Sequence, residues 1–194
     1  NANYSSYGIQ IITDDTVESI TLGYNDETVS GSDIFTRAMN SYNNAIETLN
    51  TRAEAYLNTD YASNARSVGS VPNNKNSQAE YIYFWEHQFR NEDTNYETDY
   101  NQMTNLGIRV SNREYWLASR DVYSNLSYCD INMRSVSASG ALRSDDNLFC
   151  YMNMQGGTGC DTHNNIWLRP VFTLKSGIKV TGGNGTEDSP YTLG

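Results

Sequence analysis

Alternation of apolar and polar residues predicts two short strands near the start of the chain. Residues 7–13 carry apolar side chains at every second position, and residues 17–23 alternate in the same way. Asp14 and Asp15 lie between the two runs and have the composition of a turn. We therefore expect the two strands to pair with each other as a hairpin.

After a polar loop the apolar residues change to a spacing of three and four, which is typical of a helix. This spacing holds from Phe35 to Leu57. Residues 60–80 are mostly polar and are expected to be irregular, and the aromatic-rich run at 81–89 is interpreted as irregular or helical. A second, shorter helix is expected at residues 94–106, where Gly107 follows as a suitable C-cap.

The rest of the chain is dominated by short alternating runs, which predict strands. They are residues 115–123, 128–136, 148–154, 171–174 and 178–180. The polar, Gly-containing runs at 137–147 and 156–165 are expected to be loops. The fold class is therefore α+β, with antiparallel sheets, two helices and long irregular loops. The 194 residues contain no internal repeat or linker and are expected to form a single domain.

Composition and charge limit the partners that such a domain can have. The chain has 13 basic and 23 acidic residues, a formal net charge of -10, so its surface repels nucleic-acid backbones and anionic lipid. No apolar run approaches the roughly 20 residues of a membrane span. No signal peptide is visible, and because the chain begins at Asn1 we expect a mature or trimmed product.

The polar surface relies on uncharged residues, and this favours an extracellular protein. Tyr occurs 15 times, and Asn, Ser, Thr and Asp are abundant. Tyr combined with small polar residues is typical of evolved binding loops, because Tyr gives contact area at low entropic cost. A generic polar secreted protein would have the same composition, so both interpretations stand.

The three cysteines do not form a recognisable redox or metal motif. Cys129, Cys150 and Cys160 have spacings that match no zinc site, and an odd number excludes a fully paired set within one chain. Cys129 and Cys150 fall in neighbouring predicted strands. They are either cross-strand neighbours joined by a disulfide or, the more ordinary interpretation, two small buried residues.

Other candidate chemistry is weak. Cys160, Asp161 and His163 could be imagined as a nucleophile with its base, but they lie close together in a Gly-rich run with no support for a defined geometry. Asp145 and Asp146 could contribute to a calcium site, but no spaced set of acidic ligands accompanies them. The chain has no phosphate-binding loop, HExxH or GxSxG motif. The sequence thus predicts no catalytic residue, no metal and no cofactor.

Several segments of the second half resemble a known family. They are YWLASR at 115–120, LRPVFTLKSG at 168–177, VTGGNGT at 180–186 and PYTL at 190–193. Together they resemble bacterial surface proteins with a C-type-lectin fold, in the subgroup related to formylglycine-generating enzyme. This group includes the variable proteins of diversity-generating retroelements. The resemblance covers residues 107–194 and extends more weakly to ARSVGSVP at 65–72.

The resemblance implies a C-type-lectin-like fold with a variable region at about residues 121–164. In this family an error-prone reverse transcriptase mutates the adenines of a template repeat. Asn codons then change to Tyr, Ser, Asp, Thr, His and others, but not to Lys, Glu, Gln, Met or Trp. Residues 121–165 contain no Lys, Glu or Trp. The remaining exceptions would be fixed positions, and they are Met133, Met152, Met154 and Gln155.

The family's division into scaffold and variable positions can be carried over residue by residue. The resemblance implies a scaffold at Val122, Tyr123, Arg134, Val136, Gly140, Leu142 and Tyr151. The ligand-binding, variable positions are Asp121, Asn125, Asp130, Asn132, Ser135, Ser137, Ala141, Arg143, Ser144, Asp145, Asp146, Asn153, Thr158, Cys160, Asp161, Thr162, His163 and Asn164. On this interpretation Cys160 is a chance outcome of diversification. The alternative is that all of these are ordinary loop and edge residues.

The sequence therefore predicts an adhesin or receptor-like domain at the cell surface, and no enzyme. Its ligand is an unknown macromolecule, a protein or a glycan, and neither nucleic acid nor direct membrane binding is expected. A calcium-dependent carbohydrate-binding lectin is one alternative. An enzyme of the formylglycine-generating type is another, but it needs activated thiols, and Cys129 and Cys150 lie on apolar strand faces.

Overall fold

The computed structural model describes residues 9–23, 34–70, 103–105, 111–124, 128–144, 150–153, 158–160, 162–184, 186 and 188–194. The aromatic-rich run at 81–89 and most of the expected second helix lie outside these residues, although residues 103–105 are helical. The helix and strands are α1 (Ile34–Glu54), β1 (Gln10–Ile12), β2 (Glu18–Gly23), β3 (Ala62–Ser67), β4 (Tyr115–Ser124), β5 (Tyr128–Val136), β6 (Leu142–Ser144), β7 (Cys150–Asn153), β8 (Thr158–Cys160), β9 (Thr162–Leu168), β10 (Pro170–Leu174), β11 (Val180–Gly182) and β12 (Thr192–Leu193).

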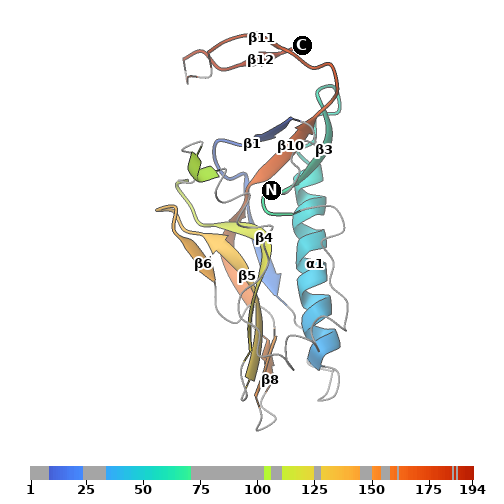
Figure 1. Ribbon diagram of the computed structural model, residues 1–194, viewed down its shortest axis with the longest axis vertical. Helices are drawn as coiled ribbons and strands as arrows, with labels where there is room; N and C mark the ends of the chain where they lie inside the picture. The colour runs from blue at the N-terminus through green and yellow to red at the C-terminus, as the bar shows by residue number, and fades with distance from the viewer. Residues whose placement is uncertain are drawn as a thin grey trace.

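The described strands form three sheets that are almost entirely antiparallel. The largest has the order β2-β9-β4-β5-β7-β8, with β6 beside β5; a smaller one has the order β1-β10-β3; and β11 pairs with β12. The exception is β4 with β9, which are parallel and meet at Tyr115 and Trp167. In Figure 1 α1 runs along the largest sheet, with the β11–β12 hairpin at one end of the molecule and β8 at the other.

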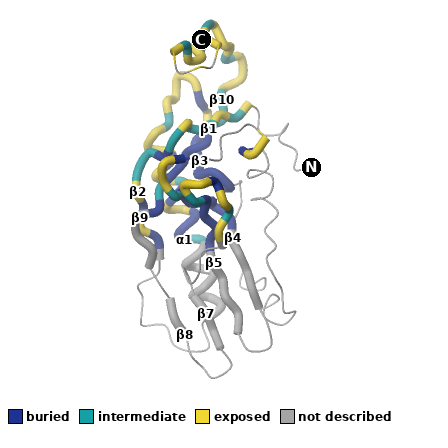
Figure 2. Tube along the Cα trace, turned by 90° about the vertical axis from the view of Figure 1, so that its left-hand side faces the viewer, coloured by how far each residue is buried: buried dark blue, intermediate teal, exposed yellow. Residues whose placement is uncertain are grey.

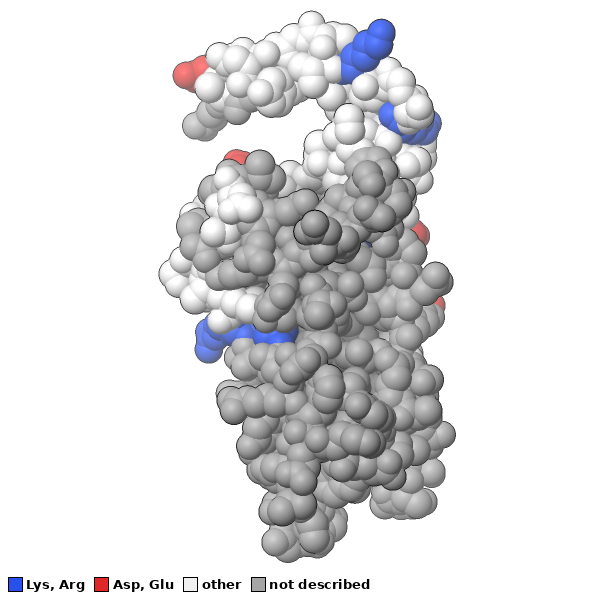
Figure 3. Space-filling model, in the orientation of Figure 1, with Lys and Arg blue, Asp and Glu red and all other residues white. Residues whose placement is uncertain are grey.

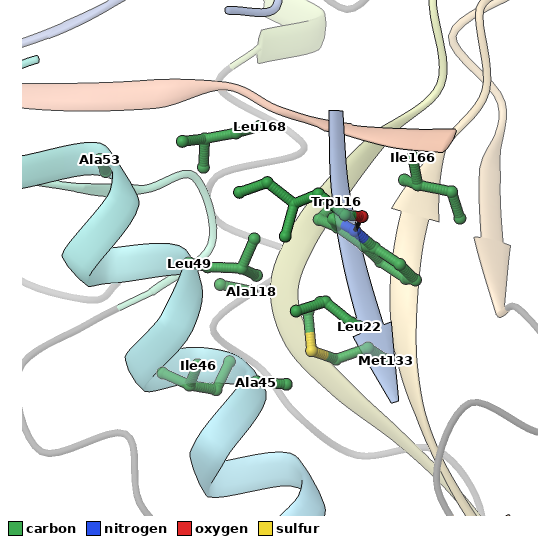
Figure 4. Packing of buried hydrophobic residues seen from close by; sticks show 11 residues of the cluster. Leu22, Ala45, Ile46, Leu49, Ala53, Trp116, Ala118, Met133, Ile166 and Leu168 are labelled. Carbon is green, nitrogen blue, oxygen red and sulfur yellow. Dashed lines mark hydrogen bonds between the residues drawn. The ribbon is translucent and has the colours of Figure 1, made fainter. Parts of the chain in front are cut away.

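The first hydrophobic core lies between α1 and the largest sheet. On α1, Ala45, Ile46, Leu49 and Ala53 are buried, and their spacing places them on one face of the helix. Figure 4 shows how they face the apolar side chains of the sheet. The sheet contributes Ile20, Leu22, Trp116, Ala118, Met133, Ile166 and Leu168 to this core. The apolar stripe of α1 therefore decides which side of the helix packs against the sheet.

A second core covers the opposite face of the same sheet near its centre. Tyr115 and Leu117 are fully buried there, and they alternate along β4 with Trp116 and Ala118 of the first core. Other members of the second core are Val68, Met103, Val136 and Val171. Figure 2 shows the buried centre and, beyond it, the exposed C-terminal hairpin. The start of β4 is thus enclosed on both faces, as its continuous apolar run YWLA requires.

A bulge in β4 separates this enclosed part of the sheet from the part that continues toward β7 and β8. The register of β4 on β5 shifts between Leu117 and Arg120. At the shift the Ala118 N–H donates to the Val68 carbonyl over 2.7 Å. Gly69, which follows Val68, has φ +84°, and a Cβ built there would lie 2.9 Å from the Ala118 nitrogen. The turn after β3 therefore packs against the bulge and fixes it in place.

A buried arginine lies where the chain passes between the two larger sheets. Arg169 connects β9 to β10 and is fully buried. Its Nε donates to the Thr13 carbonyl over 3.0 Å, and Nη2 donates to the Asp14 carbonyl over 2.8 Å. The guanidinium carbon also lies 5.0 Å from the Tyr115 ring centroid. Arg169 thus ties the crossing between β9 and β10 to the crossing between β1 and β2.

The structure confirms the coarse fold and corrects four local expectations. The helix and β5 lie where they were predicted, and the protein is a mixed α and β fold with antiparallel sheets. The predicted N-terminal hairpin is wrong, because β1 pairs with β10 and β2 pairs with β9. Residues 60–80, expected to be irregular, include β3. The two expected loops also contain strands, since residues 137–147 include β6 and residues 156–165 include β8 and the start of β9. Among the described residues no helix is long and apolar enough to cross a membrane.

Candidate ligand-binding face

The strand register assigns each position of β5 to one of two faces. Met133 is fully buried in the core beside α1, and its face is called here the helix-side face. Because β5 pairs with β7 without a register shift, Asp130 and Asn132 fall on the opposite face, called the outer face. The alternation expected from the sequence therefore holds along β5.

The same register brings positions from three strands together on the outer face. Asp121 of β4 is opposite Asn132, and Tyr123 is opposite Asp130. Directly opposed residues share a face and have Cα atoms roughly 4.5–5.5 Å apart. On the other side of β5, Tyr151 is opposite Asp130, and Asn153 is opposite Tyr128. These seven positions, called the outer patch, are Asp121, Tyr123, Tyr128, Asp130, Asn132, Tyr151 and Asn153.

Three of the expected ligand-binding positions fall on the helix-side face instead. Thr158 is opposite Met152, and Cys160 is opposite Cys150, which itself lies opposite Ile131 on the face of Met133. His163 is opposite Leu22, whose side chain is buried in the first core. Thr162 is opposite Gly23, and Asn164 lies at the register shift between β2 and β9. The register therefore keeps Thr158, Cys160 and His163 off the face of the outer patch, while Thr162 lies on that face but on β9, which is not one of the three strands that carry the patch.

The hairpin between β5 and β6 gives a mixed result. Ser135 is fully buried, and its hydroxyl donates to Glu114 Oε1, so the expectation that it contacts a surface ligand is corrected. The Ala141 N–H donates to Ser137 Oγ over 3.1 Å, so Ser137 helps to shape the turn. Ala141 and Arg143 are exposed, and Arg143 Nη1 lies 3.5 Å from Glu114 Oε2.

The remaining candidate positions have less structural description. Ser144 pairs with Arg134 at the end of β6. Asn125, Asp145, Asp146 and Asp161 lie outside the described residues.

The residues assigned to the scaffold occupy fixed structural positions where their side chains are described. Arg134 and Val136 are buried, with exposed fractions of 2% and 0%. Gly140 has φ 80°, which favours glycine in the turn between β5 and β6. Leu142 packs against the second core. Each of these positions would resist substitution for a stated structural reason.

The edge of the sheet beside the outer face carries a small charged cluster that sequence reasoning missed. The Arg113 guanidinium lies 3.9 Å from the Trp167 ring centroid. Nearby, the Thr16 N–H donates to Asp15 Oδ1 over 2.7 Å, and this bond is the main reason that the pKa of Asp15 is lowered from 3.8, with Arg113 contributing attraction. Residues 113 and 167 are far apart in the chain, so no local pattern could have indicated this contact.

The described residues offer no site for a metal. Within them there is no group of three or more His, Cys, Asp or Glu side chains that could hold an ion. In the view of Figure 3 the described side chains are mostly uncharged, and uncharged atoms predominate on the C-terminal hairpin. The chemistry available at the outer patch is therefore that of phenol rings, amides and two carboxylates.

Comparison with known proteins adds no family assignment. No family model, no curated protein and no solved structure matches this chain.

Proposed function

We propose that this chain is an extracellular ligand-binding domain with a C-type-lectin-like fold, in which a retroelement diversifies four of the seven positions of the outer patch. The observation that carries the proposal is the strand register. It gathers Asp121, Asp130, Asn132 and Asn153, four of the expected variable positions, on one face of three adjacent strands. A binding surface that varies without loss of the fold requires such an arrangement.

Two of the segments that carry the family resemblance support the proposal, because they supply buried residues to the enclosed part of the protein. YWLASR at 115–120 supplies Tyr115, Trp116 and Leu117, which are fully buried in the two cores. LRPVFTLKSG at 168–177 supplies Leu168 and the buried Arg169 at the crossing between the sheets. The buried residues of these two segments are thus scaffold, and the candidate variable positions of the outer patch lie beyond the β4 bulge, on β4, β5 and β7.

The composition of the outer patch suits protein or glycan recognition. Three of its seven positions are Tyr, which supplies rigid contact area, and the other four are Asp or Asn, which supply adaptable hydrogen bonds. Aromatic anchors ringed by polar groups are typical of binding hot spots. The net charge of -10 favours a neutral or basic partner. Binding without turnover at the cell surface follows from this interpretation.

Deep sequencing of the coding region for residues 107–175 in a population of source cells tests the proposal. Substitutions should concentrate at Asp121, Asp130, Asn132 and Asn153 and be confined to codons with template adenines. Buried positions such as Trp116 and Met133 should be invariant and serve as the internal control. A uniform sequence, or variation spread equally over buried positions, would refute diversification in that population.

A further inference from the structure

We propose that Cys150 and Cys160 form a cross-strand disulfide that fastens the edge strand β8 to β7. The two cysteines are directly opposed partners in the antiparallel β7–β8 pair. Neither the family resemblance nor the proposed binding function requires this bond. It is inferred from the register of the described strands alone.

The register selects one pairing among the three cysteines. Opposed residues in an antiparallel pair have Cα atoms about 4.5 or 5.5 Å apart, depending on the hydrogen-bond pattern. Both values lie within the approximately 4.4–6.8 Å range of disulfides. Cys129 is opposite Met152, so it is only a diagonal neighbour of Cys150. Diagonal neighbours are roughly 7–8 Å apart, too far for a bridge without backbone movement.

The third possible pair is excluded by the strand order. Cys129 lies on β5 and Cys160 on β8, with β7 between them. Adjacent strands are about 4.8 Å apart, so two strand spacings separate these residues by more than a disulfide can span. One disulfide with Cys129 left as a free thiol also accounts for the odd number of cysteines.

The bond would stabilise a part of the sheet that has few other supports. Along the described strand order β8 is the last strand, it has three residues, and its one neighbour is β7. Cys150, in turn, is opposite Ile131 of β5, next to the outer-patch positions of that strand. A covalent link at this edge restricts opening of β8, and through β7 it limits motion of the strands that carry the outer patch.

Formation of the bond is an oxidation by thiol–disulfide exchange with a small-molecule disulfide. The thiolate of one cysteine attacks that disulfide, forming a mixed disulfide and releasing one thiol. The thiolate of the other cysteine then attacks the protein sulfur and releases the second thiol. Two thiols of the chain become one disulfide, two protons leave, and the oxidant is reduced to two thiols. Extracellular compartments hold such bonds oxidised.

Peptide mapping of the whole folded chain tests the inference. The chain is equilibrated with oxidised and reduced glutathione, free thiols are alkylated without reduction, and trypsin is added. Trypsin cleaves after Arg143 and after Lys175 but not after Arg169, because Pro170 follows it. One tryptic peptide, residues 144–175, therefore contains both Cys150 and Cys160. Cys129 lies in a separate peptide, residues 121–134. We expect the first peptide to be unalkylated and lighter by two hydrogens, and Cys129 to be alkylated. If that peptide is then cleaved after Tyr151, which lies between the two cysteines, the disulfide should keep the two fragments joined.

Two variants complete the experiment. Cys129→Ser should keep the link, and Cys160→Ser should leave both remaining thiols open to alkylation. When the chain is oxidised in denaturant, all three cysteine pairings should appear. The entropy of closing a disulfide loop depends only weakly on its length, so no pairing is strongly preferred in the unfolded chain. Alkylation of both Cys150 and Cys160 in the folded wild type, or a link from Cys150 to Cys129, would overturn the inference. None of these results depends on whether the outer patch is diversified.

Discussion

Replacement of Gly69 by Ala tests the close packing between the turn after β3 and the β4 bulge. Gly69 has φ +84°, and an added Cβ would lie 2.9 Å from the Ala118 nitrogen and 3.0 Å from Leu117 Cγ. The left-handed backbone alone costs an alanine about 1–2 kcal/mol. Forcing an extra carbon against a packed backbone destabilises the fold by roughly a further 1–3 kcal/mol. Alanine also lowers the conformational entropy of the unfolded chain, which offsets about 0.4–1 kcal/mol of this loss. We expect Gly69→Ala to lower the free energy of unfolding by about 2–4 kcal/mol.

Gly177→Ala is the matched control for this measurement. Gly177 also has a left-handed backbone, with φ +94°, but no atom lies within 4 Å of an added Cβ. The backbone strain and the unfolded-state effect are therefore common to both variants, and the difference between them isolates the contact at Ala118. Urea denaturation followed by the fluorescence of Trp116 and the other tryptophans gives both free energies. Equal losses within about 0.5 kcal/mol would refute the close packing inferred for the bulge.

Two further predictions follow from the candidate site. Ser135→Tyr should destabilise the fold by about 2 kcal/mol or more because Ser135 is fully buried, whereas Ala141→Tyr, at an exposed position of the same hairpin, should change stability by less than roughly 0.5 kcal/mol. Equal losses in urea denaturation would contradict the burial of Ser135. The second prediction concerns Asp15, whose pKa in the folded state is lowered by the hydrogen bond from the Thr16 N–H. The ionised Asp15 therefore stabilises the wild type above pH 3.8, and Asp15→Ala should lower the free energy of unfolding in that range. The difference in unfolding free energy should therefore be constant above about pH 5 and shrink as the pH falls through the folded pKa, and growth of the difference on acidification would disprove this.

Elements with a strong local period could be predicted from the sequence, and elements defined by distant partners could not. The helix was visible because Ile46, Leu49 and Ala53 follow a helical spacing, and these side chains form its buried face. The pairing of β1 was not visible, because its partner β10 lies about 160 residues further along the chain. β3 was missed because ASNARS has little strand propensity; its pairing with β10 decides its conformation.

The candidate site divides in the same way. The outer-face positions Asp130 and Asn132 could be assigned from alternation, since one register step changes the face. The burial of Ser135 could not, because it depends on Glu114, whose carboxylate accepts the serine hydroxyl. The opposition of Cys150 and Cys160 was hidden for another reason: the run that contains β8 is rich in Gly and Thr, and it had the composition of a loop.

The crossing at Arg169 has a mechanical consequence. Tension on the C-terminal hairpin enters β10 through the chain, and β10 is hydrogen-bonded to antiparallel neighbours on both sides. Tension directed along the strand would load both rows of hydrogen bonds together, where tension across it would break them one after another. From β10 the tension passes through Arg169 into β9, which is held by β2 and by the Trp167 N–H bond to the Glu114 carbonyl. Tension on the C-terminal hairpin would thus be passed through Arg169 from one of the larger sheets to the other.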